Sequence, residues 1–456
     1  MAPFRGVRYN PHRASGIANV TSPPYDVIGA TTLDELLQAD PYNVVRLILP
    51  RSAPHDTGRG DVEPNQEAAQ RLRSWLEASI LAADPEPSLY VYEQSSAEGT
   101  EPGWQQRGLI ALVKVGAPEA TGIVPHEDVM PGPVRDRRDL MAATRANLEP
   151  IFLVYQGGAS SARAAGLPGA AVAARPGTGS VATALTEEVA ARRSPLVTAV
   201  TPDGIRHRLW RLADPGEHAA VAADLATRSA LIADGHHRYA AYRELQAMMP
   251  GGGPWDYGLA FLVDADAYPP RLGAIHRVIP DLPAQLAARL AAKASFTVRR
   301  IEASDLDQAL DCLALAGSDG AAFLLAGPPA AAGRQDGEGT TPWYWLLTDP
   351  DPAVVDAAMP AGASPAWRRL DAAILQQVLL GHGWGIEDSE RSVLVFHDAR
   401  EAVTAAVAAK GVAVVMGAVP FGIVRDIALL GERVPRKSTS FGPKPRSGLV
   451  LRGFDA

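Results

Sequence analysis

Residues 231–245 read LIADGHHRYAAYREL and join an apolar strand to a helix. Residues 231–233 are typical of a short buried strand, and residues 239–248 have the composition of a helix. Between them lies Asp234-Gly235-His236-His237-Arg238, in which Gly235 permits a tight turn. The motif is therefore expected at a helix N-terminus, where unpaired N–H groups and the positive end of the helix dipole attract anions, phosphate above all.

The side chains of this motif suit phosphate chemistry. His236 and His237 add hydrogen-bond donors, and Arg238 adds a fork-shaped cation. Asp234 can orient a histidine, bind Mg²⁺ or accept a proton from a hydroxyl. The alternative is a plain helix cap, with Asp234 as the capping residue and the other side chains in solvent. Two adjacent histidines can also indicate zinc, but neither a cysteine nor an HxxxH partner lies nearby in the sequence.

The rest of the chain alternates between strand-like and helix-like segments, which predicts mixed α/β layers. Residues 43–49 (NVVRLIL) are expected to form a buried strand, and residues 136–149 a helix. The Pro- and Gly-rich residues 249–254 end the helix after the motif and are the best candidate for a linker. We therefore expect a first domain over residues 1–250 and a second, α/β domain over residues 255–456.

Composition and charge limit the classes of function. The formal net charge is −8, which disfavours a dedicated nucleic-acid binder. Cys312 is the only cysteine, so a disulfide scaffold is excluded and a reducing, cytoplasmic location is expected. We expect neither a signal peptide nor a membrane span, because no basic segment precedes an apolar one at the N-terminus and no apolar stretch is long enough. A homo-oligomer remains open.

Two acidic positions outside the motif are candidate site residues. Glu127 precedes a basic cluster at residues 135–138, where a carboxylate suits proton abstraction beside phosphates; the alternative is a solvated loop. Tyr25 and Asp26 follow two prolines and form either a rigid substrate loop or a structural turn.

The C-terminal stretch reverses the overall charge. Residues 433–452 contain six basic residues and no acidic one. Lys437, Ser438 and Thr439, together with Lys444, can clamp a triphosphate, although no Walker loop is present. The alternative is a solvated basic tail.

Several segments together resemble a known family. Besides IADGHHRYAAYREL they are SPPYDVI at 22–28, NVVRL at 43–47, His126-Glu127, Arg137 with Leu140, NLEPIFLVY at 147–155, PRKSTSF at 435–441, Pro443-Lys444 and Ser447-Gly448-Leu449. They are similar to the motifs of a bacterial and archaeal family called domain of unknown function 1015. The chain departs from that family at Gly442, where an aromatic residue is common, and at Val129, where the family usually has threonine.

The DGHHR string also resembles the phosphate-gripping motif of the ParB/sulfiredoxin superfamily, which includes kinases that phosphorylate free L-serine. This resemblance implies a mixed α+β fold with a ParB/sulfiredoxin-like N-terminal part, ATP or another nucleotide with Mg²⁺ as cofactors, and a small-molecule substrate. The implied catalytic residues are Glu127, Asp234 and His237; nucleotide contacts come from Gly235, His236, Arg238, Lys437, Ser438, Thr439 and Lys444; substrate contacts from Tyr25, Asp26 and Arg137; and a metal contact from Asp234.

The expected function is that of an ATP-dependent kinase of a small hydroxylated metabolite, with free L-serine as the first acceptor to consider. The alternative is a nucleotide-sensing protein that changes conformation without turnover, because the same loop can serve both functions.

Overall fold

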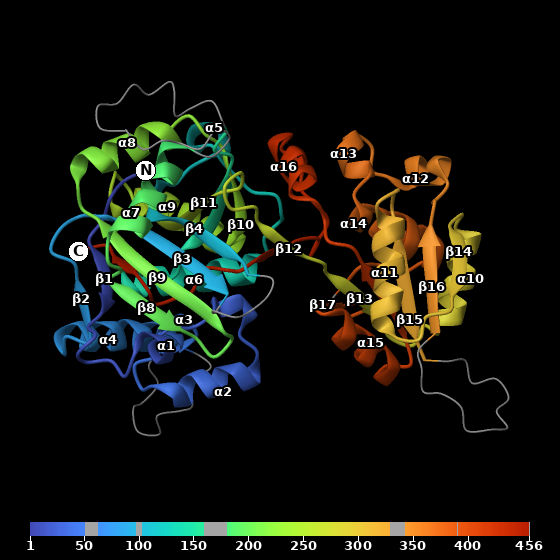
Figure 1. Ribbon diagram of the computed structural model, residues 1–456, viewed down its shortest axis with the longest axis horizontal. Helices are drawn as coiled ribbons and strands as arrows, with labels where there is room; N and C mark the ends of the chain where they lie inside the picture. The colour runs from blue at the N-terminus through green and yellow to red at the C-terminus, as the bar shows by residue number, and fades with distance from the viewer. Residues whose placement is uncertain (51–62, 97–102, 159–179, 329–342, 390, 456) are drawn as a thin grey trace. The chain divides into compact units, whose positions relative to one another are not determined.

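The computed structural model describes residues 1–50, 63–96, 103–158, 180–328, 343–389 and 391–455 (Figure 1). The chain divides into two units. Unit 1 comprises Met1–Pro270 and Pro443–Ala456, and unit 2 comprises Arg271–Gly442. Among the residues in these ranges, no helix combines the length and apolarity needed to cross a membrane.

The described residues of unit 1 form an eight-stranded sheet in the order β5-β10-β7-β11-β4-β3-β9-β8. Its strands are β3 (Leu89–Ser96), β4 (Gln105–Lys114), β5 (Ile123–Val124), β7 (Ile151–Tyr155), β8 (Val197–Val200), β9 (Ile205–Leu212), β10 (Ala230–Asp234) and β11 (Tyr257–Asp264). β10 pairs with β5 in parallel and β11 with β7 in parallel, and the other neighbours are antiparallel. One sheet face packs in a core with Leu153 and Trp210, and the opposite face buries a row of aromatic rings, Tyr92, Phe261 and Phe152.

A second sheet of unit 1 has the order β2-β1-β20-β6 within the described ranges. Its strands are β1 (Gly6–Tyr9), β2 (Leu81–Ala83), β6 (Ala146–Asn147) and β20 (Leu451–Gly453). The helices of unit 1 are α1 (Ile17–Val20), η1 (Tyr25–Val27), α2 (Ala30–Ala39), α3 (Val45–Ile48), α4 (Pro64–Glu77), α5 (Pro118–Thr121), α6 (Pro131–Thr144), α7 (Val181–Arg192), α8 (Pro215–Leu225), α9 (His236–Met248) and η3 (Pro254–Asp256). β20 pairs with β1, so residues 443–456 belong to the same unit as residues 1–270.

Two expectations about local structure are wrong. Residues 43–49 contain the helix α3 rather than a strand, and the Asn43 side chain accepts a hydrogen bond from the Val45 N–H at 2.9 Å. A short, mostly buried apolar run has no periodicity that separates strand from helix, which explains the error. The helix expected at 136–149 is α6, which runs from Pro131 to Thr144 and so begins and ends earlier than expected. It ends at Thr144 because Arg145 adopts a left-handed conformation with φ of +50°.

The division into units differs from the boundary expected near residue 250. β11 lies beyond the expected linker, yet it pairs with both β4 and β7 inside the sheet of unit 1. Of the Pro- and Gly-rich residues 249–254, the first five connect α9 to η3 and Pro254 begins η3, so the segment joins neighbouring elements of one unit. The chain leaves unit 1 only at Pro270 and returns to it at Pro443.

Unit 2 contains, in its described residues, an antiparallel sheet in the order β14-β16-β15-β18-β13-β17 and a ribbon of β12 and β19. The strands are β12 (Arg271–Gly273), β13 (His276–Ile279), β14 (Thr297–Ile301), β15 (Phe323–Gly327), β16 (Trp343–Thr348), β17 (Leu394–Phe396), β18 (Val412–Met416) and β19 (Ser440–Gly442). The helices are α10 (Ala284–Lys293), α11 (Leu306–Gly317), α12 (Pro352–Ala358), α13 (Pro365–Arg368), α14 (Asp371–Ile374), the π-helix η4 (Leu375–Trp384), α15 (Ala399–Ala408) and α16 (Phe421–Leu429). Its core includes Leu324, Leu346 and Val415. Both units mix helices with largely antiparallel sheets, which confirms the predicted mixed α+β class.

Candidate functional site

The DGHHR motif forms the junction between β10 and α9, as the sequence predicts. Gly235 occupies the N-cap position with φ of +90°, a left-handed conformation that favours glycine, and no side chain caps α9. A Cβ atom at this position would lie 3.0 Å from Ile151 Cγ2 and 3.1 Å from Arg238 Nε. Glycine is therefore required twice, for the backbone conformation and for the close approach of the Arg238 side chain.

The two histidines hold a neighbouring loop. His236 is buried, and its Nε2 accepts a hydrogen bond from the His126 N–H at 3.4 Å, while the two imidazole rings meet edge to face at 4.6 Å. His237 Nε2 accepts a hydrogen bond from the Met130 N–H at 3.1 Å. Both Nε2 atoms must be unprotonated to accept these bonds. The histidines therefore fasten the loop that carries Glu127 onto the first turn of α9.

Arg238 is an internal cation rather than an exposed one. Its guanidinium donates hydrogen bonds to the Asp234 carboxylate and to the Pro150 carbonyl, and it lies 6.0 Å from the centroid of the Tyr25 ring. Burial opposes its charge, but the attraction of Asp234 and Glu149 outweighs burial and raises the pKa of Arg238 above its ordinary value. Within the described residues, Arg238 Nε has no hydrogen-bond partner.

Lys444 joins two carboxylates that lie far apart in the sequence. Its Nζ lies 2.6 Å from Asp26 Oδ2 and 2.5 Å from Asp234 Oδ1, and we call these three residues the Lys444 bridge. Burial lowers the pKa of Lys444, but the two carboxylates overcome this effect and raise the pKa above its ordinary value. For Asp26, burial raises the pKa, and the stronger combined attraction of Lys444 and Arg238 lowers it below the ordinary value.

Tyr25, Arg137 and Glu149 pack beside the bridge. The Tyr25 N–H donates to Glu149 Oε1 at 3.0 Å, and the Arg137 guanidinium lies 4.3 Å from the centroid of the Tyr25 ring. Burial of the Tyr25 phenol raises its pKa to about 12. Arg137 donates to the Ile48 carbonyl at 2.7 Å and lies 3.7 Å from Glu149 Oε2. These bonds hold the loop of Tyr25 against α6 and give Arg137 a positioning role.

Sequence reasoning missed Glu149 as a site residue. It is buried, and its Oε1 also accepts a hydrogen bond from Ser447 Oγ at 3.1 Å, so it ties the returning C-terminal segment to the loop of Tyr25. The available signal was an acidic residue between Leu148 and Pro150, inside a stretch that is otherwise mostly apolar. An acid in such surroundings needs a partner, and two of its partners here, Tyr25 and Ser447, lie far away in the sequence.

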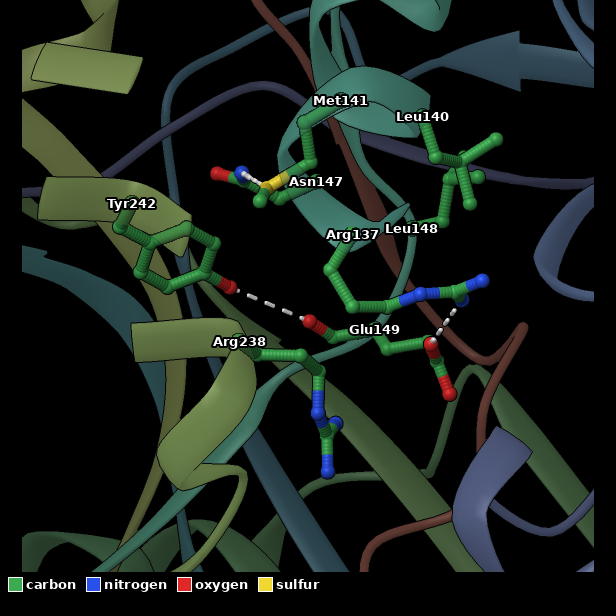
Figure 2. A pocket seen from close by; sticks show the side chains of 8 residues that line it. All are labelled: Arg137, Leu140, Met141, Asn147, Leu148, Glu149, Arg238 and Tyr242. Carbon is green, nitrogen blue, oxygen red and sulfur yellow. Dashed lines mark hydrogen bonds and ion pairs between the residues drawn. The ribbon is translucent and has the colours of Figure 1, made fainter. Parts of the chain in front are cut away.

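A small cavity lies beside this cluster (Figure 2). Its lining consists of Arg137, Leu140, Met141, Asn147, Leu148, Glu149, Arg238 and Tyr242. The Tyr242 hydroxyl donates to the Glu149 carbonyl oxygen at 3.3 Å, as Figure 2 shows. The cavity volume is about 20 Å³, which suits one ordered water molecule and not a nucleotide.

The remaining predicted residues lie in other places. Glu127 is half-buried in the loop between β5 and α6. Lys437 belongs to unit 2, where its side chain is exposed, its φ is +55° and its carbonyl accepts a hydrogen bond from Arg277 Nη2 at 2.9 Å. Ser438 is buried and donates to the Pro435 carbonyl at 2.5 Å, and Thr439 is half-buried beside it in sequence. That Lys437, Ser438 and Thr439 bind a triphosphate together with Lys444 stays a prediction.

Two further basic residues of the C-terminal stretch are buried in unit 1. Arg446 donates to Thr21 Oγ1 at 2.8 Å, and Arg452 donates to Asn147 Oδ1 at 3.1 Å. Burial lowers the pKa of Arg446, and it lowers that of Arg452 to about 10. The interpretation of residues 433–452 as one solvated basic tail is therefore wrong, because these guanidiniums hydrogen-bond inside the fold.

The residues around Asp234 do not fit a resident metal ion. Asp234 Oδ1 contacts Lys444 and Asp234 Oδ2 contacts Arg238, so both oxygens are already held by cations. Across the described ranges, no group of three or more His, Cys, Asp or Glu side chains is arranged to hold a metal.

Solved structures provide three comparisons. A free serine kinase in complex with AMP is similar with 11% identity and a TM-score of 0.33, covering 73% of this chain and 87% of that one. C-terminally truncated SbnI from Staphylococcus aureus is similar with 9% identity and a TM-score of 0.34, covering 75% and 86%. A conserved hypothetical protein from Pyrococcus furiosus is similar with 11% identity and a TM-score of 0.33, covering 73% and 90%. At these TM-scores the similarity carries no argument about activity.

Sequence comparisons give a family. A search of curated proteins found no match. The family model described as "Protein of unknown function (DUF1015)" matches residues 1–167 and 170–373 and so spans most of the chain. The chain therefore belongs to the DUF1015 family.

Proposed function

We propose that this protein binds the phosphate groups of ATP at the N-terminus of α9 and transfers the terminal phosphoryl group to the hydroxyl of a small metabolite. The observation that carries this proposal is the junction at Gly235, where a helix of 13 residues begins without a side-chain cap and follows a left-handed glycine. Such a helix start presents N–H groups and a positive dipole end to an anion.

The charges around this helix start support phosphate binding. Lys444 lies against Asp234, the residue that precedes Gly235, and provides a nearby ammonium group. Arg238 and Arg137 are held by carboxylates and backbone carbonyls, so they shape the site rather than move toward a ligand. Phosphoryl transfer depends mainly on positioning and on neutralising charge. The fixed helix start supports positioning, and the positive end of its dipole supports a negative charge.

In the proposed reaction, the acceptor hydroxyl oxygen forms a bond to the γ-phosphorus of ATP, and the bond from that phosphorus to the bridging oxygen breaks to release ADP. The hydroxyl proton passes to a carboxylate, and we assign this role to Glu127. Asp26 is the weaker choice because the cations around it lower its pKa. His236 and His237 fasten the loop of Glu127 to α9, close to the proposed phosphate position.

Free L-serine is the first acceptor to test. The reason is the resemblance of the DGHHR string to the motif of kinases that phosphorylate free L-serine. The residues around the helix start support phosphate binding but do not select one hydroxylated metabolite, so the panel should include other amino acids and polyols.

The test is a product assay on the pure protein. Labelled ATP and Mg²⁺ are incubated with the acceptor panel, and phosphorylated products are separated and counted. We expect a product with at least one acceptor, and a rate at least 100-fold lower for Glu127→Gln because the proton acceptor is lost. His218→Ala is the matched control, since His218 lies on α8 and its Nε2 donates a hydrogen bond to the Leu212 carbonyl at 2.9 Å. Absence of both product and ATP binding would contradict the proposal.

A second candidate is nucleotide sensing without turnover. It is favoured by the Lys444 bridge, in which two of the nearby carboxylates are neutralised and therefore poor proton acceptors. Tight binding of ATP with neither a phosphorylated product nor released phosphate would select this function over the kinase.

A further inference from the structure

We propose that Lys444 is a tethered cation that takes the place of a divalent metal ion between Asp26 and Asp234. In this account the protein itself holds no Mg²⁺ at Asp234. If the proposed kinase function holds, Mg²⁺ arrives with ATP and leaves with ADP.

In the Lys444 bridge, two carboxylates converge on one cation. Two carboxylate oxygens from different elements, Asp26 Oδ2 in η1 and Asp234 Oδ1 at the end of β10, approach one nitrogen atom at 2.6 and 2.5 Å. These lengths lie at the upper end of the oxygen distances of about 2.3–2.6 Å around bound Ca²⁺ and exceed the distances of about 2.0–2.1 Å around Mg²⁺. One ammonium nitrogen therefore occupies the position where two carboxylates from separate elements would otherwise share a cation.

The charges of Asp26 and Asp234 also require a cation between them. Asp234 Oδ2 is held by Arg238, whereas Asp26 Oδ2 and Asp234 Oδ1 both depend on Lys444. Without the ammonium, the exposed carboxylate of Asp26 and the buried carboxylate of Asp234 would face each other, which is unfavourable for like charges. They would then take up a proton or another cation, so the loss of Lys444 should create a metal site that the intact protein does not have.

The chain also fixes the backbone on both sides of Lys444. The Pro443 carbonyl accepts a hydrogen bond from Gln94 Nε2 at 3.0 Å, and Arg446 donates to Thr21 Oγ1 at 2.8 Å. Gln94, Thr21 and Arg446 are all buried. The lysine thus projects from a short segment fixed against unit 1, as expected for a built-in cation and not for a surface side chain that pairs by chance.

The test measures Mn²⁺ binding by electron paramagnetic resonance on the full chain without nucleotide. Mn²⁺ is the probe because carboxylate sites accept it in place of Mg²⁺. We expect the wild-type protein to bind no Mn²⁺ that depends on Asp26. We expect Lys444→Met to gain one site, with a Mn²⁺ affinity at least tenfold higher than that of any nonspecific Mn²⁺ binding to the wild type. The double variant Lys444→Met with Asp26→Asn should lose that site. Lys444→Arg keeps a cation and should gain none.

Lys114→Met is the matched control. It removes the same charge from an exposed position at the end of β4 in unit 1, so a gain of Mn²⁺ there would show a general charge effect. Two results would overturn the proposal: a wild-type Mn²⁺ site abolished by Asp26→Asn, or a folded Lys444→Met protein that gains no site. The wild-type measurement decides the question even if Lys444→Met does not fold. Because no nucleotide is present, a failed kinase assay leaves this result unaffected.

Discussion

Lys437 and Lys444 lie in the same basic stretch of sequence, yet their surroundings in the structure differ. Lys437 is exposed in unit 2 on a left-handed turn that Arg277 holds through backbone carbonyls. Lys444 is bound by two carboxylates in unit 1. The comparison shows that basic residues close together in the sequence need not share one basic surface. The contacts that each side chain makes in the folded chain decide its role.

The largest effect is expected from Asp234→Asn, which leaves Lys444 and the buried Arg238 without their shared carboxylate. Removing one partner of a buried ion pair costs about 3–5 kcal/mol of unfolding free energy. Asp356→Asn breaks a pair with Arg368 in unit 2 whose carboxylate is exposed, and it should cost only about 1 kcal/mol. Urea unfolding of both variants checks the difference, and equal losses would show that the Lys444 bridge is not a special feature.

The next effect is expected from Gly235→Ala. The new Cβ would lie 3.0 Å from Ile151 Cγ2 in a left-handed conformation, so we expect a loss of about 1–3 kcal/mol and at least tenfold weaker ATP binding. Gly431→Ala in unit 2 is the matched control, because Gly431 has φ of +77° with nothing within 4 Å. It should lose about 1 kcal/mol and leave ATP binding unchanged, as calorimetric titration will show. Equal ATP affinity in both variants would remove the role of the α9 N-terminus.

Much of the main motif can be predicted from the sequence, since a strand, a glycine turn and a helix are local features. The interactions of Lys444 cannot, because Asp26 lies 418 residues away and only the folded chain brings them together. Glu149 and Arg446 were missed or misinterpreted for the same reason. Residues 43–49 were assigned to the wrong element because burial hides periodicity in a short apolar run.

A smaller effect concerns pH. The pKa of Asp26 is lowered on folding, so its contribution to stability is present above its ordinary pKa of 3.8 and is lost as the pH falls through the folded value. The pKa of Lys444 is raised, so its contribution is present below 10.5 and is lost as the pH rises through the folded value. The stability difference between wild type and Lys444→Met should therefore be flat in the neutral range and shrink at both extremes in a series of thermal unfolding curves. A difference that grows at either extreme would contradict the bridge.

The smallest effect is expected from Lys437→Met, which removes an exposed charge in unit 2. Its unfolding free energy should change by less than about 0.5 kcal/mol. Thermal unfolding measured in parallel with Lys444→Met makes the comparison direct. A loss as large as that of Lys444→Met would mean that the two lysines do not differ as the structure indicates.

The central claim is that phosphate groups bind at the N-terminus of α9, and a crystal structure with a non-hydrolysable ATP analogue tests it most directly. The account predicts phosphate oxygens within hydrogen-bond distance of the backbone N–H groups in the first turn of α9, beside Gly235 and Lys444. An analogue bound in a defined position with its phosphates away from this turn would contradict the account.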